Sequence, residues 1–430
     1  MKDRKPIIEL DGRTGEGGGQ LVRIASALAA VASQPIRITH VRGNREGSRG
    51  GGLKSQHVTA IDYLAKATAA DVSGLSIGSQ TLEFRPQLRP SQLAERHIKI
   101  AAESPAASTM LIFQAVFPYL LFAGNDKGEP VTLEISGGTN VSWSLSFEYL
   151  DQVLLPALHE AFGIAVERKL LARGWSLGRQ QQRGKVEFKF KPLRPGETLR
   201  PKDNANNNKD GAAAAAVYRP GNGALPVVED VEGIDISMIV PFGMRDSMME
   251  ALVEDLEQLF PNVEVDFKIN EDSGDNSRIY VLLVAKAGTV RWGRDVLTSM
   301  PKKAKGKGGM QTASSLSATI SRRLCKDLYE EVSSGGVVDE FLQDQLIIFQ
   351  ALADGRTSFP RGETKESLEH AVAKLTIRDD LRKDRTDKPF GEGSDHTTTA
   401  RWVVSQLLPG AEWYNGGLLC QGVGMYMPKK

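Results

Sequence analysis

Apolar residues recur at two different periods along this chain, and each change of period marks the boundary between an expected strand and an expected helix. Alternating runs such as Ile7–Leu10 and Pro35–Val41 predict half-buried strands, whereas apolar residues three and four positions apart predict helices. Four helices are expected in the first half of the chain. The first ends at Ala32, and the others span Gln56–Ala69, Pro105–Gly124 and Phe147–Phe162. Further strands are expected around Ser76–Ile77 and at Thr81–Phe84, Ile164–Leu171 and Lys185–Phe190. This alternation indicates a mixed α/β protein.

One helix–strand plan occurs twice in the first half of the chain. Glu129–Ile135 matches Gln34–Ile38 in both pattern and place, and a helix follows each of them. A third unit is expected to begin near Gln311–Val332, a helix rich in small residues, and to continue in helix Val338–Leu352. A unit repeated in this way predicts an α/β domain built from several copies of one plan.

The plan is interrupted between the second and third units. Leu193–Pro226 contains prolines, an asparagine run and the alanines Ala212–Ala216, so we expect a disordered low-complexity insertion. Asp230–Met300 regains order and is expected to hold an inserted subdomain, with strands Ile234–Val240, Val263–Ile269 and Arg278–Ala285 and the helix Asp246–Phe260. The expected limits are therefore 1–100 and 101–192 for two units, 193–226 for the insertion, 227–300 for the smaller domain and 301–430 for the third unit with the C-terminal segment.

Composition limits the possible partners. The formal net charge is +1 over 430 residues, so nucleic-acid binding would need a local basic patch. Two cysteines, far apart, argue against a disulfide framework and suit a reducing intracellular compartment. The N-terminus has no apolar signal region, and Pro118 interrupts the longest apolar stretch, which we interpret as a buried helix rather than a membrane span.

The stretch Gly15–Arg23, GEGGGQLVR, surrounds one carboxylate, Glu16, with glycines and leads directly into a helix. Glycine lets backbone N–H groups approach a ligand closely, and the helix N-terminus favours an anion, so the loop suits a phosphate. It lacks the Gly-Lys-Ser/Thr of a P-loop, and Gln20 stands where the dinucleotide fingerprint needs its last glycine. A tight strand-to-helix turn is the alternative interpretation.

A second glycine-rich loop, Arg42–Lys54, provides the local basic patch. Its charged side chains are Arg42, Arg45, Arg49 and Lys54 against a single Glu46. Gln56 and His57 open the helix that follows, and we interpret the histidine as a capping partner.

Three further polar features are unusual for purely structural positions. Asp344 and Gln345 share a helix face with Phe341 and Ile348, so the carboxylate is either paired or metal-bound, or it turns toward water at the boundary. His396 lies at a helix N-terminus, behind Ser394 or Asp395 as the N-cap, where a neutral imidazole could be a nucleophile, a base, a ligand or a structural residue. Gln114 is either a satisfied core amide or a ligand contact.

Together, the motifs LDGRTGEGGGQLVR, QPI–VRGNR–GL–QH, SGGTN, FLQDQL and SDHTTTARWVVSQLLP resemble those of the RNA 3′-terminal phosphate cyclases, in the same order. The resemblance covers nearly the whole chain apart from 193–226 and parts of the C-terminal third. It implies an α/β (α+β) fold of three repeated helix–sheet units with a smaller α/β domain inserted in the third. It also implies a ligase that uses ATP and Mg²⁺ or Mn²⁺ to convert an RNA 3′-terminal phosphate to a 2′,3′-cyclic phosphate through a covalent histidine–AMP and an RNA-adenylate.

The same resemblance implies roles for individual residues. The nucleophilic histidine of the family falls on His396, and the metal-associated carboxylates fall on Glu16 and Asp344. The nucleotide is expected to contact Gly18, Gly19, Gln20, Gln114, Phe341, Asp344 and Gln345. The substrate phosphate and the RNA are expected to contact Arg23, Arg42, Arg45 and Gln56.

The chain departs from the family pattern in two loops. The motif RGxxPxGGG is replaced by RGWSLGRQQQRGK from Arg173, and Ser142–Leu145 replaces small residues after SGGTN. Asn140 stands where some members carry aspartate. These changes concern the geometry of the RNA end and turnover more than adenylation.

Three functions remain open: an active cyclase, a non-catalytic relative that works in ribosome assembly, and an RNA-binding scaffold. Because the non-catalytic relatives lack the nucleophilic histidine, His396 together with Glu16 and Asp344 favours the enzyme. The expected partners are ATP and an RNA 3′-end, without a membrane or DNA-specific partner. The resemblance suggests the nucleus, with the cytoplasm as a second site; Lys302–Lys307 fits a nuclear signal or a solvated linker.

Overall fold

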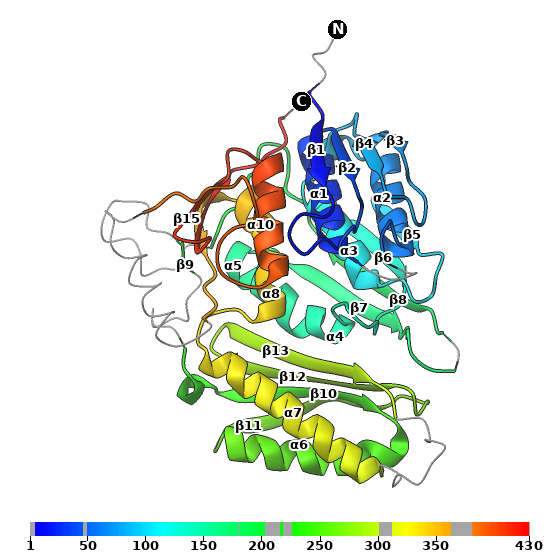
Figure 1. The fold of residues 1–430 in the computed structure, drawn as a ribbon, viewed down its shortest axis with the longest axis vertical. Coiled ribbons are helices and arrows are strands. Elements are labelled where there is room, and N and C mark those ends of the chain that lie inside the picture. The colour runs from blue at the N-terminus through cyan, green and yellow to red at the C-terminus, as the bar shows by residue number, and fades with distance from the viewer. Residues whose placement is uncertain are drawn as a thin grey trace.

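The computed structural model describes residues 5–45, 50–179, 181–202, 216–217, 226–300, 312–362 and 381–429. Four sheets of four strands each organise these residues, and helices pack against them (Figure 1). Three sheets share one topology and form three units, whereas the fourth belongs to a smaller domain in the lower half of Figure 1. In the described ranges, no helix combines the length and apolar character that crossing a membrane requires.

The first unit shows how the alternation of apolar residues builds a sheet. In β2, Ile36 and Ile38 are buried while Arg37 and Thr39 face outward. Strands β1 and β2 are parallel, β4 pairs with β2 and β3 in the antiparallel sense, and the order is β1-β2-β4-β3. The elements are β1 (Ile8–Asp11), α1 (Gly19–Ala32), β2 (Ile36–Thr39), α2 (Ser55–Thr68), β3 (Asp71–Ser73) and β4 (Leu82–Arg85).

The second unit repeats this topology with the order β5-β6-β8-β7. Strands β5 and β6 are parallel and the remaining pairs are antiparallel. A short 3₁₀ turn, Pro90–Gln92, precedes it. The elements are β5 (His97–Ala101), α3 (Thr109–Leu121), β6 (Val131–Gly137), α4 (Phe147–Tyr149), a π-helical turn (Leu150–Leu154), α5 (Leu155–Phe162), β7 (Val166–Ala172) and β8 (Gly184–Phe190).

The third unit has the same topology but is divided in the sequence. Its first strand β9 pairs in parallel with β14, and β16 lies between β14 and β15, so the order is β9-β14-β16-β15. The smaller domain is inserted between β9 and α8. The elements are β9 (Ala216–Val217), α8 (Glu340–Leu352), β14 (Asp354–Ser358), α10 (Asp395–Leu407), β15 (Glu412–Tyr414) and β16 (Leu419–Val423).

The inserted domain has the sheet order β11-β10-β12-β13, in which only the pair β10–β11 is parallel. Helices α6 and α7 pack against each other and cover one face of this sheet (Figure 1). A 3₁₀ turn lies at each end of β10, at Val228–Asp230 and Phe242–Met244. The elements are β10 (Gly233–Val240), α6 (Arg245–Leu259), β11 (Glu264–Asp272), β12 (Ile279–Ala287), β13 (Val290–Thr298) and α7 (Ala313–Ser333).

The predicted fold class is confirmed: three helix–sheet units of one topology with a smaller α/β domain inserted in the third. The apolar stretch around Pro118 is the buried helix α3, as expected. The strand expected around Ser76–Ile77 is wrong, because the chain turns there and the strand is β3, a few residues earlier. The helix expected over 147–162 is interrupted by the π-helical turn.

The range expected to be a disordered insertion, 193–226, is described in part. Leu199 is 2% exposed in the core, and the N–H of Leu193 donates to the carbonyl of Leu121 at 2.8 Å. Strand β9 also lies within this range. Residues 203–215 and 218–225 lie outside the described ranges. The basic linker Lys302–Lys307 and residues 363–380 lie outside them as well.

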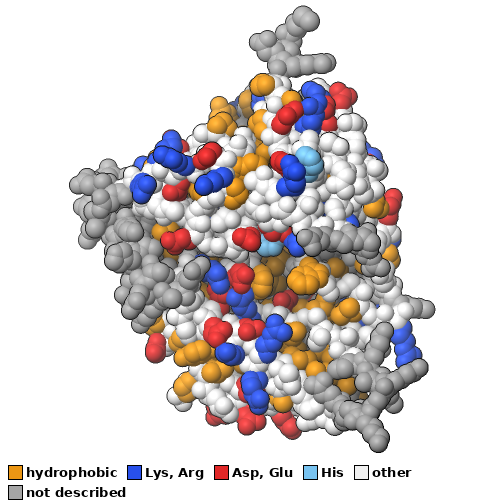
Figure 2. Space-filling model, in the orientation of Figure 1, with side chains coloured by type: hydrophobic (Ala, Val, Ile, Leu, Met, Phe, Trp, Pro, Cys, Tyr) orange, Lys and Arg blue, Asp and Glu red, His pale blue; other side chains and the backbone are white. Residues whose placement is uncertain are grey.

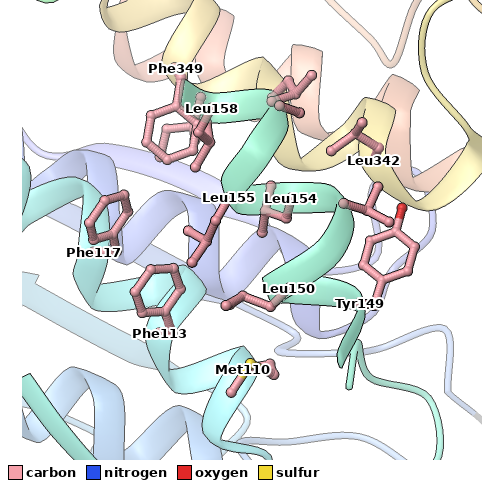
Figure 3. Close-up of a cluster of buried hydrophobic side chains, with 14 of the residues drawn as sticks. Met110, Phe113, Phe117, Tyr149, Leu150, Leu154, Leu155, Leu158, Leu342 and Phe349 are labelled. Carbon is pink, nitrogen blue, oxygen red and sulfur yellow. The ribbon is translucent and has the colours of Figure 1, made fainter. Parts of the chain in front are cut away.

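A cluster of apolar side chains joins the second unit to the third (Figure 3). Phe113 and Phe117 stack in α3 with ring centroids 4.6 Å apart, and Phe349 of α8 lies 6.0 Å from Phe117. Leucines of the π-helical turn and α5 fill the space between α3 and α8 (Figure 3). Burying aromatic rings at this junction stabilises the relative position of α3 and α8, both of which contribute polar residues to the site.

Candidate active site

The glycine loop before α1 brings several polar groups unusually close together. Gly15 and Gly17 adopt positive φ, of 64° and 61°, which favours glycine. A Cβ on Gly18 would lie 2.2 Å from Oε1 of Glu16, and a Cβ on Gly19 would lie 2.6 Å from Nε2 of His57. The loop is therefore a tight strand-to-helix turn and also a place where only glycine leaves room for two functional side chains.

His396 lies beside this loop, in the first turn of α10. Ser394 caps the helix by accepting the N–H of Thr397 at 3.2 Å, which confirms the expected helix N-terminus. Nδ1 of His396 lies 2.9 Å from Oε1 of Gln20 in α1. The amide nitrogen of Gln20 donates to Oδ2 of Asp344 in α8. Three residues that are distant in the sequence thus form one hydrogen-bonded chain.

This chain fixes the tautomer of His396. A carboxylate only accepts hydrogen bonds, so the NH₂ group of Gln20 faces Asp344 and its carbonyl oxygen faces the imidazole. Nδ1 of His396 must then carry the proton and donate it to Gln20. The other ring nitrogen, Nε2, keeps its lone pair, and the His396 side chain is 49% exposed. The site therefore presents a partly exposed nucleophilic nitrogen.

The electrostatic surroundings keep this imidazole neutral. Burial lowers the pKa of His396 below its ordinary value of 6.5; the carboxylate of Asp344 opposes this effect, and Arg23 and Arg45 add to it. Burial raises the pKa of Asp344 to about 6, against the hydrogen bonds and positive charges around it. At neutral pH the pair is thus a neutral imidazole and an ionised carboxylate.

The hydrogen-bonded chain continues from Asp344 to the second unit. The amide of Gln345 donates to Oδ1 of Asp344 at 3.1 Å and accepts from Gln114 of α3 at 2.7 Å. Nε of Arg23 donates to Oε1 of Gln114 at 2.6 Å. Burial lowers the pKa of Arg23 to about 10, so the guanidinium stays charged at neutral pH. Each of the three units contributes to this network.

Gln114, Asp344 and Gln345 also line a narrow cleft with a free volume of about 20 Å³. Its remaining walls are apolar and come from α1, α3, α5, the π-helical turn and α8. Gln114 is thus a hydrogen-bonded amide that also lines the cleft. The structure is therefore compatible with both interpretations of this residue, as a satisfied core amide and as a ligand contact. A cleft of this volume holds about one water molecule, so a larger ligand would need its walls to move.

Glu16 is the carboxylate closest to the imidazole: Oε2 lies 3.9 Å from Nδ1 of His396. Its side chain is 8% exposed and forms an ion pair with Arg45, yet neither oxygen accepts a hydrogen bond of ordinary geometry from the described residues. Within the described ranges, no three His, Cys, Asp or Glu side chains converge as a preformed metal cluster. A buried carboxylate that keeps Oε2 without a hydrogen-bond partner among the described residues fits a single hard cation completed by ligand oxygens and water.

The remaining candidate residues lie at differing places. Nη1 of Arg42 donates to the carbonyl oxygens of Gly50 and Gly52, at 2.7 and 3.3 Å, so Arg42 holds the basic loop together. Arg45 is 48% exposed and reaches Glu16. Gln56 is in the first turn of α2 and is half-buried. Phe341 is 39% exposed in the first turn of α8, three positions before Asp344.

His57 is a residue whose surroundings sequence reasoning missed. The expected capping contact is present, because the N–H of Lys54 donates to Nδ1 of His57 at 3.0 Å. Nε2 must then carry the proton, and it is buried without a hydrogen-bond partner among the described residues. Burial and the nearby Arg23 hold the pKa of His57 well below its ordinary value. This N–H lies close to the start of α1, since a Cβ on Gly19 would be 2.6 Å from Nε2. In the sequence, His57 was marked by its place directly after Gln56.

Of the two loops that depart from the family pattern, the one from Arg173 is packed against the second unit and the inserted domain. Nη1 of Arg173 pairs with the buried Glu148, which also accepts from Asn140 at 3.2 Å. Trp175 is 2% exposed, and Arg278 of the inserted domain lies over its ring at 5.7 Å. The altered loop therefore fastens the inserted domain to the second unit. Trp143 in the other altered loop is fully exposed at a φ of 64°.

Comparisons with known proteins show which family the chain resembles. The family model for RNA 3′-terminal phosphate cyclase matches residues 14–410. The RNA 3′-terminal phosphate cyclase of Thermococcus onnurineus is 31% identical over 405 residues, covering 94% of each chain. Those of Pyrococcus abyssi and Methanosarcina mazei are 30% and 31% identical, covering 81% and 86% of this chain and 87% and 94% of the relatives. The chain belongs to the RNA 3′-terminal phosphate cyclase family.

Proposed function

We propose that this protein converts an RNA 3′-terminal phosphate to a 2′,3′-cyclic phosphate at the expense of ATP, with His396 as the nucleophile. The observation that carries the proposal is the hydrogen-bonded chain from Asp344 through Gln20 to Nδ1 of His396. It holds the imidazole in the tautomer whose free nitrogen, Nε2, can attack phosphorus. The family membership supplies the substrate class.

The first step of the proposal is adenylyl transfer. Nε2 of His396 attacks the α-phosphorus of ATP, a P–N bond forms, and the bond to the diphosphate leaving group breaks. The charge on the imidazolium is stabilised by Asp344 through Gln20. Arg23 and Arg45 are placed beside the imidazole, where their guanidinium groups can neutralise phosphate oxygens.

Two further transfers complete the reaction. An oxygen of the RNA 3′-phosphate attacks the histidine-bound AMP, which breaks the P–N bond and gives an RNA-adenylate. The neighbouring 2′-hydroxyl then attacks the terminal phosphate, the ring closes, and AMP leaves. Because each step needs only positioned phosphates, contacts to the RNA end suffice without reading of its sequence.

Glu16 would hold a Mg²⁺ or Mn²⁺ ion in this proposal, since its buried oxygens have no other hydrogen-bond partners among the described residues. Such a cation stabilises negative charge on phosphate oxygens. Phe341 offers a partly exposed ring for the adenine, Gln114 and Gln345 offer amides at the cleft, and Arg42 supports the loop that carries Arg45.

Label transfer from ATP labelled at the α-phosphate tests the proposal. Wild type should acquire acid-labile, alkali-stable label with Mg²⁺ or Mn²⁺, and folded His396→Ala should acquire none. Absence of label on folded wild type would refute adenylation and favour the non-catalytic role in ribosome assembly. Label on both proteins would refute His396 as the nucleophile.

We also propose that the protein is located in the nucleus. A fluorescent fusion confined to the cytoplasm would contradict this location.

A further inference from the structure

The first turn of α8 is held by residues from two other parts of the chain. Asp339 caps the helix by accepting the N–H groups of Phe341 and Leu342, each at 2.9 Å. The same carboxylate accepts the hydroxyl of Tyr149 from α4 at 2.6 Å and the N–H of Gly293 from β13 at 2.7 Å. Asp339 is fully buried. The inserted domain is thus tied directly to the helix that carries Asp344 and Gln345.

The next residue of the inserted domain, Arg294, contacts Phe341. Its Cζ atom lies 4.9 Å from the centroid of the Phe341 ring, within the range of a cation–π contact. The ring of Tyr149 meets Phe341 edge-on, with centroids 6.3 Å apart and an interplanar angle of 83°. Two neighbours therefore restrict this side chain, while 39% of the residue stays exposed.

Arg294 is itself held by acidic residues. Nη2 pairs with the buried Glu331 at the end of α7 and lies 3.4 Å from Glu340 in α8. Arg361 pairs with the same Glu331, at 2.7 Å, and with Glu340 at 3.9 Å. The ring contacts of the described residues place Arg294 against Phe341 and give Arg361 no aromatic partner. The two arginines therefore share their acidic partners but differ in the aromatic contact.

We propose that Arg294 is a positioning residue for the nucleotide base: it holds the Phe341 ring in the orientation on which the base of ATP stacks. The inserted domain thereby completes the nucleotide site of the main body. The proposal rests on the proposed function, because it takes Phe341 as the surface for the base.

The physical reason is preorganisation. A partly exposed phenylalanine samples several rotamers, and stacking a base on it would have to select one of them. A guanidinium fixed by Glu331 and Glu340 supports one orientation of the ring before ligand arrives. Figure 2 shows hydrophobic side chains exposed in the middle of this face, where the inserted domain meets the rest of the molecule. A stacked base would cover apolar surface there.

The test compares Arg294→Met with Arg361→Met. Both variants remove one arginine and leave Glu331 paired with the other, so their melting temperatures should fall to a similar degree. Calorimetric titration should show ATP binding weakened about three- to tenfold by Arg294→Met, the range expected for one partly exposed cation–π contact. Arg361→Met should bind ATP like wild type. Neither variant should change the affinity for inorganic tripolyphosphate, which has no base.

A double-mutant comparison separates stacking from general loosening. On the background Phe341→Ala, Arg294→Met should weaken ATP binding no further, because the ring through which it acts is gone. The positioning role would be overturned if the two arginine variants lost ATP affinity equally. It would also be overturned if Arg294→Met lost as much affinity for tripolyphosphate as for ATP. Full additivity with Phe341→Ala would overturn it as well. If wild type bound no ATP, the proposed function itself would fail. If wild type bound ATP and Arg294→Met bound it with the same affinity, the positioning role alone would fail.

Discussion

The imidazole of His396 donates its Nδ1 proton to the side-chain oxygen of Gln20, at 2.9 Å and across 376 positions of sequence. This contact decides which ring nitrogen is free, and with it which atom of the protein can form a bond to phosphorus. It also joins the third unit to the first at the point where chemistry is expected.

Gln20→Leu should therefore slow adenylyl transfer without unfolding the protein. Loss of the partner that fixes a histidine tautomer typically costs about 10- to 100-fold in function. Single-turnover label transfer measures the effect. Gln34→Leu is the matched control: Gln34 follows the same helix and bonds only backbone carbonyls, at 2.7 and 3.0 Å, away from the imidazole. Equal rates for the two variants would contradict the role of Gln20.

The rate of adenylyl transfer should rise with pH over a range that lies below 6.5. The folded-state pKa of His396 is lowered from 6.5 and that of Asp344 is raised to about 6, so both groups lose their protons before pH 7. Because the Asp344 carboxylate raises the pKa of His396, Asp344→Asn should move the inflection to lower pH. A pH–rate profile of single-turnover transfer shows both effects. An inflection that stayed in place would argue against their coupling.

Gly18→Ala should displace Glu16 and reduce metal-dependent transfer. The added Cβ would lie 2.2 Å from Oε1 of Glu16, and overpacking of this kind costs about 1–3 kcal/mol of stability. Gly243→Ala, in open space, is the control and should leave activity and stability unchanged. Metal titration of the transfer rate should show a weaker apparent affinity for Mg²⁺ or Mn²⁺ in Gly18→Ala only. An unaltered metal titration would disconnect Glu16 from the cation.

Arg42 and Arg45 should respond differently to substitution by methionine. Arg42→Met removes two hydrogen bonds to backbone carbonyls, so it should lower the free energy of unfolding by about 1–3 kcal/mol. Arg45→Met removes the ion-pair partner of the largely buried Glu16, and it should weaken ATP binding in a salt-dependent way, whereas Arg42→Met should leave the salt dependence of binding unchanged. Chemical denaturation and titrations at two ionic strengths distinguish the two. The reverse pattern would exchange the roles of the two residues.

Asp295 should make stability depend on pH. Burial raises its pKa from 3.8 to about 6, with Glu148 and Asp339 adding to the effect and Tyr280 and Arg294 opposing it. The folded state thus binds this proton more tightly than the unfolded state, so Asp295 stabilises the fold increasingly as pH falls from about 6 toward 4. Asp295→Asn should stabilise the protein by about 1–2 kcal/mol at pH 7.5, with a smaller gain near pH 5. A gain that is constant with pH would rule out this ionisation as its cause.

Much of the site was predictable because its residues lie in short motifs. Gln20, Gln114, Asp344, Gln345 and His396, all named from the sequence, form one hydrogen-bonded network in the structure. The order of the contacts was not predictable, because no local spacing specifies that an amide of α1 bridges α8 and α10. Their chemical roles stay predictions until adenylation is measured.

The fold was predictable where periodicity was strong and contacts were local. Strands β5, β9, β13, β14, β15 and β16 were missed: β15 is only Glu412–Tyr414, and β14 contains Gly355 and polar residues. Trp413 and Cys420 are buried opposite each other across the paired strands β15 and β16, and no visible alternation of apolar residues marks their burial. The same holds for Arg173 and Arg278, whose contacts depend on how the inserted domain docks.

Figure 2 shows acidic and basic side chains interspersed over the face it presents, in keeping with a net charge of +1. Any RNA that reaches this face therefore meets local groups rather than a long-range field. Association with RNA should accordingly be less sensitive to salt than that of a strongly basic protein.

The separation of β9 from α8 by a whole domain has a consequence for biosynthesis. The third sheet cannot close until α8 and β14 have been made, and α10 with its histidine emerges from the ribosome later still. The first two units and the inserted domain have local partners and can fold while the chain is still being translated. The reactive centre is then among the last features to assemble. A partly synthesised chain would have a nearly complete scaffold but would lack the proposed nucleophile.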